Sequence, residues 1–203
     1  MTVDYQTLTD EELATRSRDG SFVAFEELVR RFESRICAFV WQLCRHEIDA
    51  REITQETFVR AFQALGQFDA RQSFAPWIFT IARRKCIDHF RARKPIADCE
   101  PPEEAHGDDP GALLERREEA QNLWAVARRV LPPVQFEALW LYYVEEMSGA
   151  EIAAALGKTQ THVKVMLLRA RHALAGRLPQ PGKQNATAAR LAVRPPQAVG
   201  GSL

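Results

Sequence analysis

The sequence predicts an all-α protein made of two small helical domains that are joined by a flexible acidic linker. Apolar residues recur at steps of three and four along most of the chain, as in helices, and β-branched residues do not alternate as they do in strands. One segment rich in proline and acidic residues interrupts this pattern. With 203 residues, of which 46% are hydrophobic, the chain is long enough to bury two modest cores.

The first half of the chain has the pattern of four helices. Thr9 and Glu12 have capping-box spacing before a short first helix, and Gly20 separates it from the second. The second helix has one broad apolar stripe and is expected to be the central core helix. Its stripe consists of Phe22, Phe25, Val29, Phe32, Ile36, Phe39, Val40 and Leu43.

The third helix is predicted from Asp49 to about residue 65, and the fourth from about residue 74 to residue 93. Pro95 ends the fourth helix, because a proline ring cannot continue it. Phe90 is expected on the buried side of this helix.

Charge is unevenly distributed, although the formal net charge is zero, with 27 basic and 27 acidic residues. Residues 83–94 contain six basic residues and one acid, whereas residues 96–109 contain six acids and neither lysine nor arginine. Residues 95–110 also contain four prolines and few apolar residues, so they cannot bury enough surface to fold. We therefore predict a linker at 95–110.

The second half predicts a helix from about residue 111 to residue 130, another around Phe136, and then a helix-turn-helix. Ser148 and Glu151 have capping-box spacing at the start of its first helix, and Gly157 supplies the turn. The second helix of the pair is predicted from about residue 159 to residue 178. The tail that follows, rich in Pro, Gly, Ala and Gln, is predicted to be disordered.

The last helix sorts its residues onto two faces. Its inner stripe is Val163, Leu167, Ala170 and Leu174, and its outer face is Thr161, Lys164, Leu168, Arg171 and His172. The outer face has the chemistry to enter a DNA major groove, with Lys164, Arg169 and Arg171 on phosphates. The alternative is an ordinary amphipathic hairpin with a solvated basic face.

The fourth helix offers a second candidate nucleic-acid surface. Guanidinium groups that could neutralise phosphates lie near flat rings on which unpaired bases could stack. Phe74 and Trp77 fit a position in the core equally well. The residues concerned are Phe68, Phe74, Trp77, Arg83, Arg84 and Arg91.

Familiar catalytic and metal-binding patterns are absent from the sequence. It has no glycine-rich phosphate loop, nucleophile elbow or H-E-x-x-H motif, so we expect neither an enzyme nor a cofactor. Its four cysteines form no C-x-x-C pair, and Cys44 and His46 are spaced to point apart, so we expect no metal site. Without a signal peptide or a run of ~20 apolar residues, the chain is expected to be cytoplasmic, with no membrane insertion.

Seven runs of the sequence share the pattern of one known family. In the first half they are 24–28 (AFEEL), 49–62 (DAREITQETFVRAF) and 73–83 (SFAPWIFTIAR). In the second half they are 131–133 (LPP), 143–145 (YVE), 151–153 (EIA) and 163–171 (VKVMLLRAR). These runs resemble, in order, the second and fourth conserved domains of the extracytoplasmic-function (ECF) sigma factors of the sigma-70 family.

The resemblance implies a domain organisation and partners. Residues 1–94 would be sigma region 2, 95–110 the linker, 111–178 sigma region 4 and 179–203 a disordered tail. Such a protein binds core RNA polymerase, through the β′ clamp helices and the β flap, and promoter DNA. An anti-sigma factor is a further expected partner, and the acidic linker would thread the basic interior of the polymerase.

The resemblance also implies roles for individual residues. The polymerase-binding residues would be Asp49, Glu52, Gln55, Glu56 and Arg60. Those that capture and melt the minus-ten element would be Phe68, Phe74, Trp77, Arg83, Arg84 and Arg91. Those that read the minus-thirty-five duplex would be Thr161, Lys164, Val165, Leu168, Arg169, Arg171 and His172.

Four positions depart from the family pattern. Arg84 stands where Asn is frequent, Gln72 where Gly is frequent, and Val165 and Met166 where Ser and Arg are usual. The promoter sequence of a relative therefore cannot be transferred to this chain. Apolar contacts from Val165 and Leu168, for example to thymine methyl groups, and a weak intrinsic affinity for duplex DNA are expected instead.

Two other classes of protein share part of these features. A helix-turn-helix regulator that acts on DNA without forming a holoenzyme would explain the second half, but not the polar surface of residues 49–62. A protein-binding adaptor would not need the basic face of the last helix.

Overall fold

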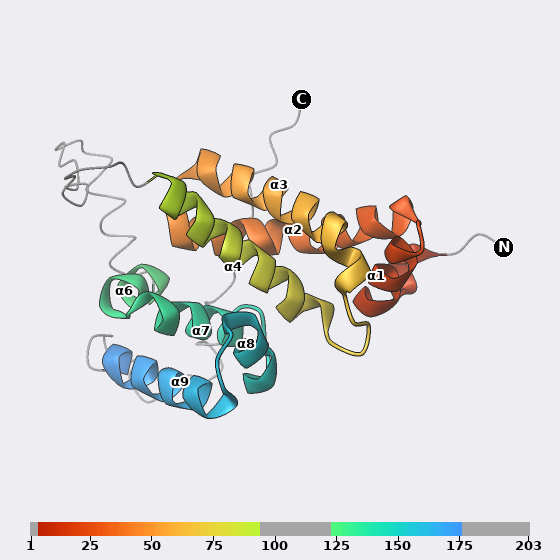
Figure 1. Cartoon of the computed structure of the whole chain (residues 1–203). Coiled ribbons are helices and arrows are strands. Elements are labelled where there is room, and N and C mark those ends of the chain that lie inside the picture. Colours follow the sequence, from red (N-terminus) through yellow and green to blue (C-terminus); the bar gives the residue numbers. More distant parts are fainter. Residues whose placement is uncertain (1–3, 94–122, 176–203) are drawn as a thin grey trace.

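The computed structural model describes residues 4–93 and 123–175, and within these ranges the chain forms α-helices and short 3₁₀ turns without a strand (Figure 1). The all-α prediction is confirmed. The linker predicted at 95–110 and the tail predicted at 179–203 lie outside the described residues.

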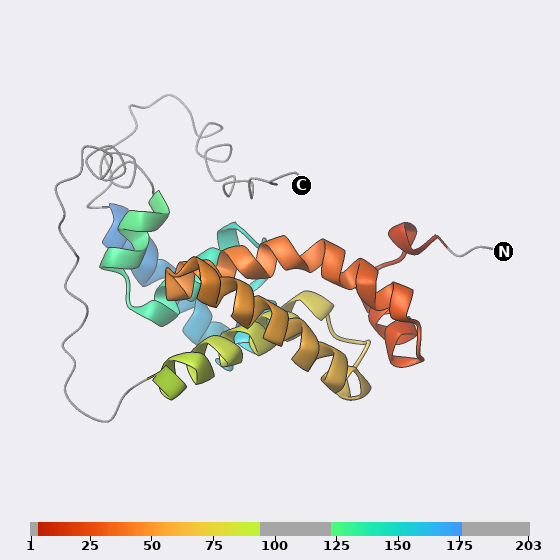
Figure 2. The same ribbon diagram turned by 90° about the horizontal axis from the view of Figure 1, so that it is seen from above.

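Four α-helices form the first half of the fold: α1 (Asp10–Arg18), α2 (Phe22–Cys44), α3 (Glu47–Ala64) and α4 (Phe74–Arg93). Short 3₁₀ turns precede α1 (η1, Tyr5–Thr7) and follow α3 (η2, Leu65–Gln67). Seen from above, α2, α3 and α4 lie alongside one another, and each packs against the other two (Figure 2).

The apolar stripe of α2 forms the centre of this half, as its spacing predicted. Phe32, Ile36 and Phe39 have no exposed surface, and two of these rings meet rings of α4 edge to face. Phe22 was expected in the same stripe but is 62% exposed, because it lies in the first turn, and among the described residues its ring meets that of Phe62 alone.

Helix α3 begins two residues earlier than its sequence pattern predicted. Arg45 takes a left-handed backbone conformation, with φ of 56°, and turns the chain after α2. His46 then caps α3, because its Nδ1 accepts a hydrogen bond of 3.3 Å from the backbone N–H of Asp49. Histidine is not among the usual capping residues, so the sequence pattern did not indicate this start.

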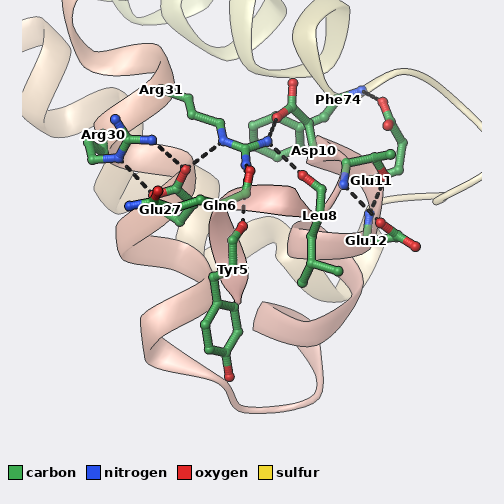
Figure 3. A network of polar contacts seen from close by, with 11 residues as sticks. Tyr5, Gln6, Leu8, Asp10, Glu11, Glu12, Glu27, Arg30, Arg31 and Phe74 are labelled. Atoms are coloured by element: carbon green, nitrogen blue, oxygen red, sulfur yellow. Dashed lines mark hydrogen bonds and ion pairs between the residues drawn. The ribbon is translucent and has the colours of Figure 1, made fainter. Parts of the chain in front are cut away.

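Arg31 anchors the N-terminal segment to α2 (Figure 3). Its guanidinium donates to the backbone oxygens of Tyr5, Gln6 and Leu8. It also pairs with Asp10 at 2.8 Å and with Glu27 at 2.7 Å. One side chain therefore joins the segment before α1, the start of α1 and α2.

The second half consists of α6 (Leu123–Val130), α7 (Pro133–Tyr143), α8 (Gly149–Leu156) and α9 (Gln160–Ala175). The predicted capping box is present: Ser148 accepts from the backbone of Glu151, whose side chain accepts from the backbone of Ser148. Gly157 has a φ of 63°, a left-handed conformation that glycine adopts without strain. Helices α8 and α9 thus form the predicted helix-turn-helix.

The two halves pack against each other. Helix α4 contacts α2 and α3 in its own half and α8 in the other half (Figure 1). The buried apolar side chains of both halves form one continuous cluster. This contact covers part of α4, whose sequence suggested a DNA-binding surface.

Candidate nucleic-acid interface

Helix α9 presents a continuous outer face. Its buried stripe contains Val163, Leu167, Ala170 and Leu174, as predicted, and also Met166. The seven residues expected to read duplex DNA are all exposed: Thr161, Lys164, Val165, Leu168, Arg169, Arg171 and His172.

The centre of this face is less basic than its edges. At 100° per residue, Thr161, Val165, Leu168 and His172 lie opposite the buried stripe, whereas lysine and arginine lie toward the sides. Met166 is only 4% exposed, so an arginine at this position would point into the core in this arrangement. The centre of the face is therefore suited to apolar contacts and the edges to phosphates.

Two tyrosines at the end of α7 hold Arg171. Its Nε donates to the hydroxyl of Tyr143 at 3.0 Å. Its Cζ lies 5.2 Å from the ring centroid of Tyr142 and 5.7 Å from that of Tyr143. Sequence spacing does not predict this platform, because the tyrosines and the arginine come from different helices. It fixes one guanidinium at the edge of the DNA-facing surface.

The aromatic residues before and within α4 divide between core and surface. Phe68 and Phe74 are 5% and 0% exposed and pack edge to face with centroids 5.5 Å apart. Their assignment as stacking surfaces is therefore corrected, because neither ring has an open face. Trp77 packs on both rings but stays half-buried, so it is the ring of this group that retains exposed surface.

The end of α4 also differs from its sequence pattern. Phe90, expected to be buried, is 42% exposed. His89 takes the inward position instead, and its Nε2 lies 3.5 Å from a carboxylate oxygen of Asp49 on α3. Arg84 and Arg91 are exposed, so the end of α4 carries both guanidinium groups and a ring on its surface.

Arg83 is occupied by the second half of the chain. Its Nε donates to a carboxylate oxygen of Glu137 on α7, and little of either side chain is exposed. Burial raises the pKa of Glu137, although Arg83 acts in the opposite direction. Of the three arginines assigned to the minus-ten element, this one faces a carboxylate rather than solvent.

The outer surface of α3 carries four of the five residues assigned to polymerase binding. Glu52, Gln55, Glu56 and Arg60 are exposed. Glu56 also pairs with Lys85 of α4 at 3.0 Å.

The fifth residue assigned to polymerase binding, Asp49, is not on this surface. Its side chain is 4% exposed and lies between two imidazoles, so the assignment is corrected. His46 Nδ1, which accepts from the backbone N–H of Asp49, lies beside this carboxylate, and His89 Nε2 of α4 lies 3.5 Å from one of its oxygens. Asp49 therefore joins the start of α3 to α4 and does not form part of an outer surface.

Apolar residues on the surface of α3 were missed. Ile48, Val59 and Phe62 are 71%, 60% and 48% exposed. Val59 lies seven residues after Glu52 and therefore on the same face of the helix. This spacing was available in the sequence, but Val59 was not weighed as a surface residue. A single exposed apolar side chain is ordinary, but three on one helix make this surface a candidate for binding a protein.

Two further findings concern membrane-spanning helices and metal ligands. Among residues 4–93 and 123–175, no helix combines the length and apolar character needed to cross a bilayer. In the same ranges, no group of three or more potential ligand side chains is arranged to hold a metal ion.

Comparison with known protein families gives two matches, one in each half. Residues 28–96 match the family described as Sigma-70 region 2, and residues 128–174 match Sigma-70, region 4. The first match covers α3 and α4, and the second covers the helix-turn-helix.

Individual relatives match over most of the chain. The sequence is 32% identical over 171 residues to RNA polymerase sigma factor NccH of Alcaligenes xylosoxydans xylosoxydans, covering 80% of this chain and 90% of that protein. It is 30% identical over 177 residues to ECF RNA polymerase sigma factor BldN of Streptomyces coelicolor. That match covers 83% of this chain but only 65% of the longer BldN protein.

Solved structures share the fold. CnrH, solved in complex with the cytosolic domain of CnrY, matches with a TM-score of 0.64 and 28% identity, covering 82% of this chain and 95% of CnrH. The sigma factor RpoE of Bartonella quintana, solved with the anti-sigma factor NepR, matches with a TM-score of 0.57 over 75% of this chain and 94% of that chain. At 20% identity, this second match concerns the fold alone.

Proposed function

The chain belongs to the ECF sigma factors of the sigma-70 family, and we propose that it binds core RNA polymerase through α3 and directs it to promoters through α4 and α9. The observation that carries this proposal is the division of surfaces. A mixed polar and apolar face on α3 and a basic-edged face on α9 belong to different halves of one chain. A regulator that bound only DNA would have no use for the first face.

Helix α9 is suited to duplex DNA. An α-helix fits the major groove, where apolar side chains can contact thymine methyl groups and cationic side chains can reach phosphates. Val165 and Leu168 supply the apolar centre, and Lys164, Arg169 and Arg171 supply the cationic edges. We assign this face to the minus-thirty-five element.

Helix α4 is suited to an unpaired strand. Trp77 supplies a ring for stacking, and Arg84 and Arg91 supply exposed charge for the phosphates. Phe68 and Phe74 both pack against the ring of Trp77 and so fix its position. We assign this group, together with Arg83 once it is released from Glu137, to the minus-ten element.

Helix α3 is suited to a protein partner, which we assign as the clamp helices of the polymerase β′ subunit, with a second contact from region 4 to the β flap. Glu52, Gln55, Glu56 and Arg60 surround Val59 on its outer face. Polar side chains around an apolar one give both specificity and buried area. CnrH was solved in complex with the cytosolic domain of CnrY, and we propose that this chain also has a further protein partner, an anti-sigma factor.

In this proposal the protein has no catalytic activity and no cofactor of its own, and it acts in the cytoplasm, where the polymerase is. It changes where the polymerase starts and leaves the chemistry of RNA synthesis to the polymerase. The binding surfaces described above require no group beyond the amino-acid side chains.

The test is association with core polymerase. The purified chain is mixed with core enzyme that lacks a sigma subunit, followed by gel filtration and by run-off transcription from a promoter library. We expect co-elution and new, discrete transcripts. A chain that shifts DNA without core enzyme and never co-elutes would instead be a helix-turn-helix regulator. A chain that does neither would be an adaptor.

A further inference from the structure

Two ion pairs join the halves of the protein. Arg83 of α4 pairs with Glu137 of α7, as described above. Arg35 of α2 pairs with Glu145, just after α7, with its Nε 2.9 Å from a carboxylate oxygen. We call these two pairs the inter-domain latch. Their partners are separated by 54 and 110 residues in the sequence.

The latch lies within a wider interface. Arg128 donates to the side-chain oxygen of Gln42 at 2.9 Å, and the hydroxyl of Thr80 lies 3.4 Å from the backbone oxygen of Ala155. The guanidinium of Arg35 also stacks over the ring of Phe32 at 4.7 Å. Helices α2 and α4 therefore both contact the second half of the chain through named polar groups.

Both acidic members of the latch are removed from water. The side chain of Glu145 is 2% exposed and that of Glu137 is 9% exposed. Burial raises the pKa of each carboxyl group, and the arginine partner opposes that rise. Removing the arginine would leave a buried, unpaired carboxylate, which is strongly destabilising. Each ion pair should therefore stay formed for as long as the two halves remain in contact.

We call the arrangement in which the two halves are in contact the closed arrangement. It is too compact for the two halves to reach two separate promoter elements at once. Elements about 25 base pairs apart are separated by ~85 Å at 3.4 Å per base pair. A compact body of roughly 140 residues has a radius of gyration of only about 15 Å. The chain between residues 93 and 123, fully extended, reaches about 100 Å, which is enough to let the halves separate.

The surfaces differ in how the closed arrangement affects them. The α3 face is exposed and can meet a partner without any rearrangement. Helix α4 is covered by α8 on one side, and Arg83 is occupied by Glu137. Polymerase can therefore dock first, whereas full use of α4 requires the halves to move apart.

We propose that Glu137 and Glu145 act as an intramolecular latch that withholds Arg83 and the covered side of α4 from promoter DNA until the two halves separate. This inference rests on the proposed function for the identity of the ligand of Arg83. A partner that binds the separated form more tightly than the closed form, such as a polymerase that engages both halves, shifts the equilibrium toward the separated form by its difference in affinity. Glu137 competes with a DNA phosphate for the same guanidinium.

The test uses the full chain and single changes on each side of the latch. Glu137→Gln and Arg35→Gln each break one pair without removing a residue assigned to DNA binding. Glu146→Gln is the matched control, because this neighbour of Glu145 is exposed and its loss changes the net charge as Glu137→Gln does. The readouts are the radius of gyration from small-angle X-ray scattering and the affinity for a fluorescent single-stranded DNA without core enzyme.

We expect both latch variants to have a larger radius of gyration than the wild type and to bind the DNA about fivefold more tightly or better. Arg35→Gln is the stricter test. It removes a positive charge, so it would weaken binding to single-stranded DNA if net charge alone determined the affinity. Arg35→Gln leaves the buried Glu145 carboxylate without its partner, and this carboxylate can regain water when the halves separate. Circular dichroism checks that the helices of both latch variants remain folded.

Unchanged dimensions and DNA affinity in a folded Arg35→Gln, equal to those of Glu146→Gln, would overturn the latch. That result is separate from a failure of the proposed function, which would show as a lack of co-elution of the wild type with core enzyme. Scattering reports on the latch whether or not polymerase binds.

Discussion

At the scale of single residues, Glu27 is the most strongly perturbed carboxylate of the N-terminal network. Hydrogen bonds from Arg30 and Arg31 lower the pKa of Glu27 to about 2, compared with an ordinary value of 4.5 (Figure 3). Because the ionised form is favoured in the folded state, this carboxylate stabilises the fold fully above about pH 4.5. The contribution is lost as the pH falls from 4.5 toward 2.

We predict that the melting temperature of the wild type falls between pH 5 and pH 2.5 more steeply than that of Glu27→Gln, measured by circular dichroism. Glu26→Gln is the control, because Glu26 is exposed on the same turn of α2. If Glu27→Gln and Glu26→Gln follow the same pH profile, the pairing with Arg30 and Arg31 does not contribute to acid stability.

Arg171 gives a second prediction at this scale. A phosphate contact from Arg171 contributes about one unit to the slope of log affinity against log salt concentration. Arg171→Ala should therefore lower both the affinity for promoter duplex and this slope. Tyr143→Phe removes only the hydroxyl that holds the guanidinium. It should lower affinity by roughly three- to tenfold and leave the slope unchanged.

A double-mutant cycle provides the control. In the Arg171→Ala background, Tyr143→Phe should have no further effect on duplex affinity, measured by fluorescence anisotropy. An equal loss in both backgrounds would mean that Tyr143 acts on DNA or on the fold independently of Arg171.

At the scale of elements, α3 and α9 each carry one exposed valine in the middle of a surface with a different proposed partner. Val59 lies on the polymerase-facing side of α3, and Val165 lies on the DNA-facing side of α9. The same change, valine to aspartate, is therefore a matched probe of both helices. Neither position is in the core, so we expect the fold to persist.

We predict that Val59→Asp weakens association with core polymerase by about tenfold or more and leaves duplex binding by the free chain unchanged. Val165→Asp should weaken duplex binding and leave association with core polymerase unchanged, because a carboxylate in the groove is repelled by the phosphates. Biolayer interferometry against core enzyme and against promoter duplex measures both. Loss of both activities in one variant would contradict the division of labour between the two helices.

At the scale of the whole molecule, the two halves share one buried apolar cluster and the ion pairs of the latch. We predict that the wild type unfolds in a single calorimetric transition, since separating the halves exposes part of that cluster. Arg35→Gln should broaden this transition or divide it into two. Two separate transitions in the wild type would show that the halves are thermodynamically independent.

Much of the fold could be predicted from the sequence, because helices depend on residues that are near one another in the chain. The capping boxes at Thr9 and Ser148, the turn at Gly157 and the buried stripe of α9 are all local patterns. Each involves residues at most a few turns apart, which spacing and residue type describe well.

The candidate surfaces could be predicted only in part. The outer face of α9 follows from helical periodicity, and the prediction of its exposed residues agrees with the structure. The faces of α3 and α4 contain residues that fit either core or surface, such as Phe74 and Asp49. Their burial depends on which other helix packs there.

By itself, the sequence determined most of the helices, the ends marked by capping boxes and the family, since these follow from local spacing and from motifs kept in order along the chain. Only the tertiary structure decided which polar groups meet. Asp49 between two histidines, Arg171 on two tyrosines and Arg83 against Glu137 all join separate helices. Such pairs leave no periodic trace in the sequence, because a contact across the molecule depends on how the helices pack.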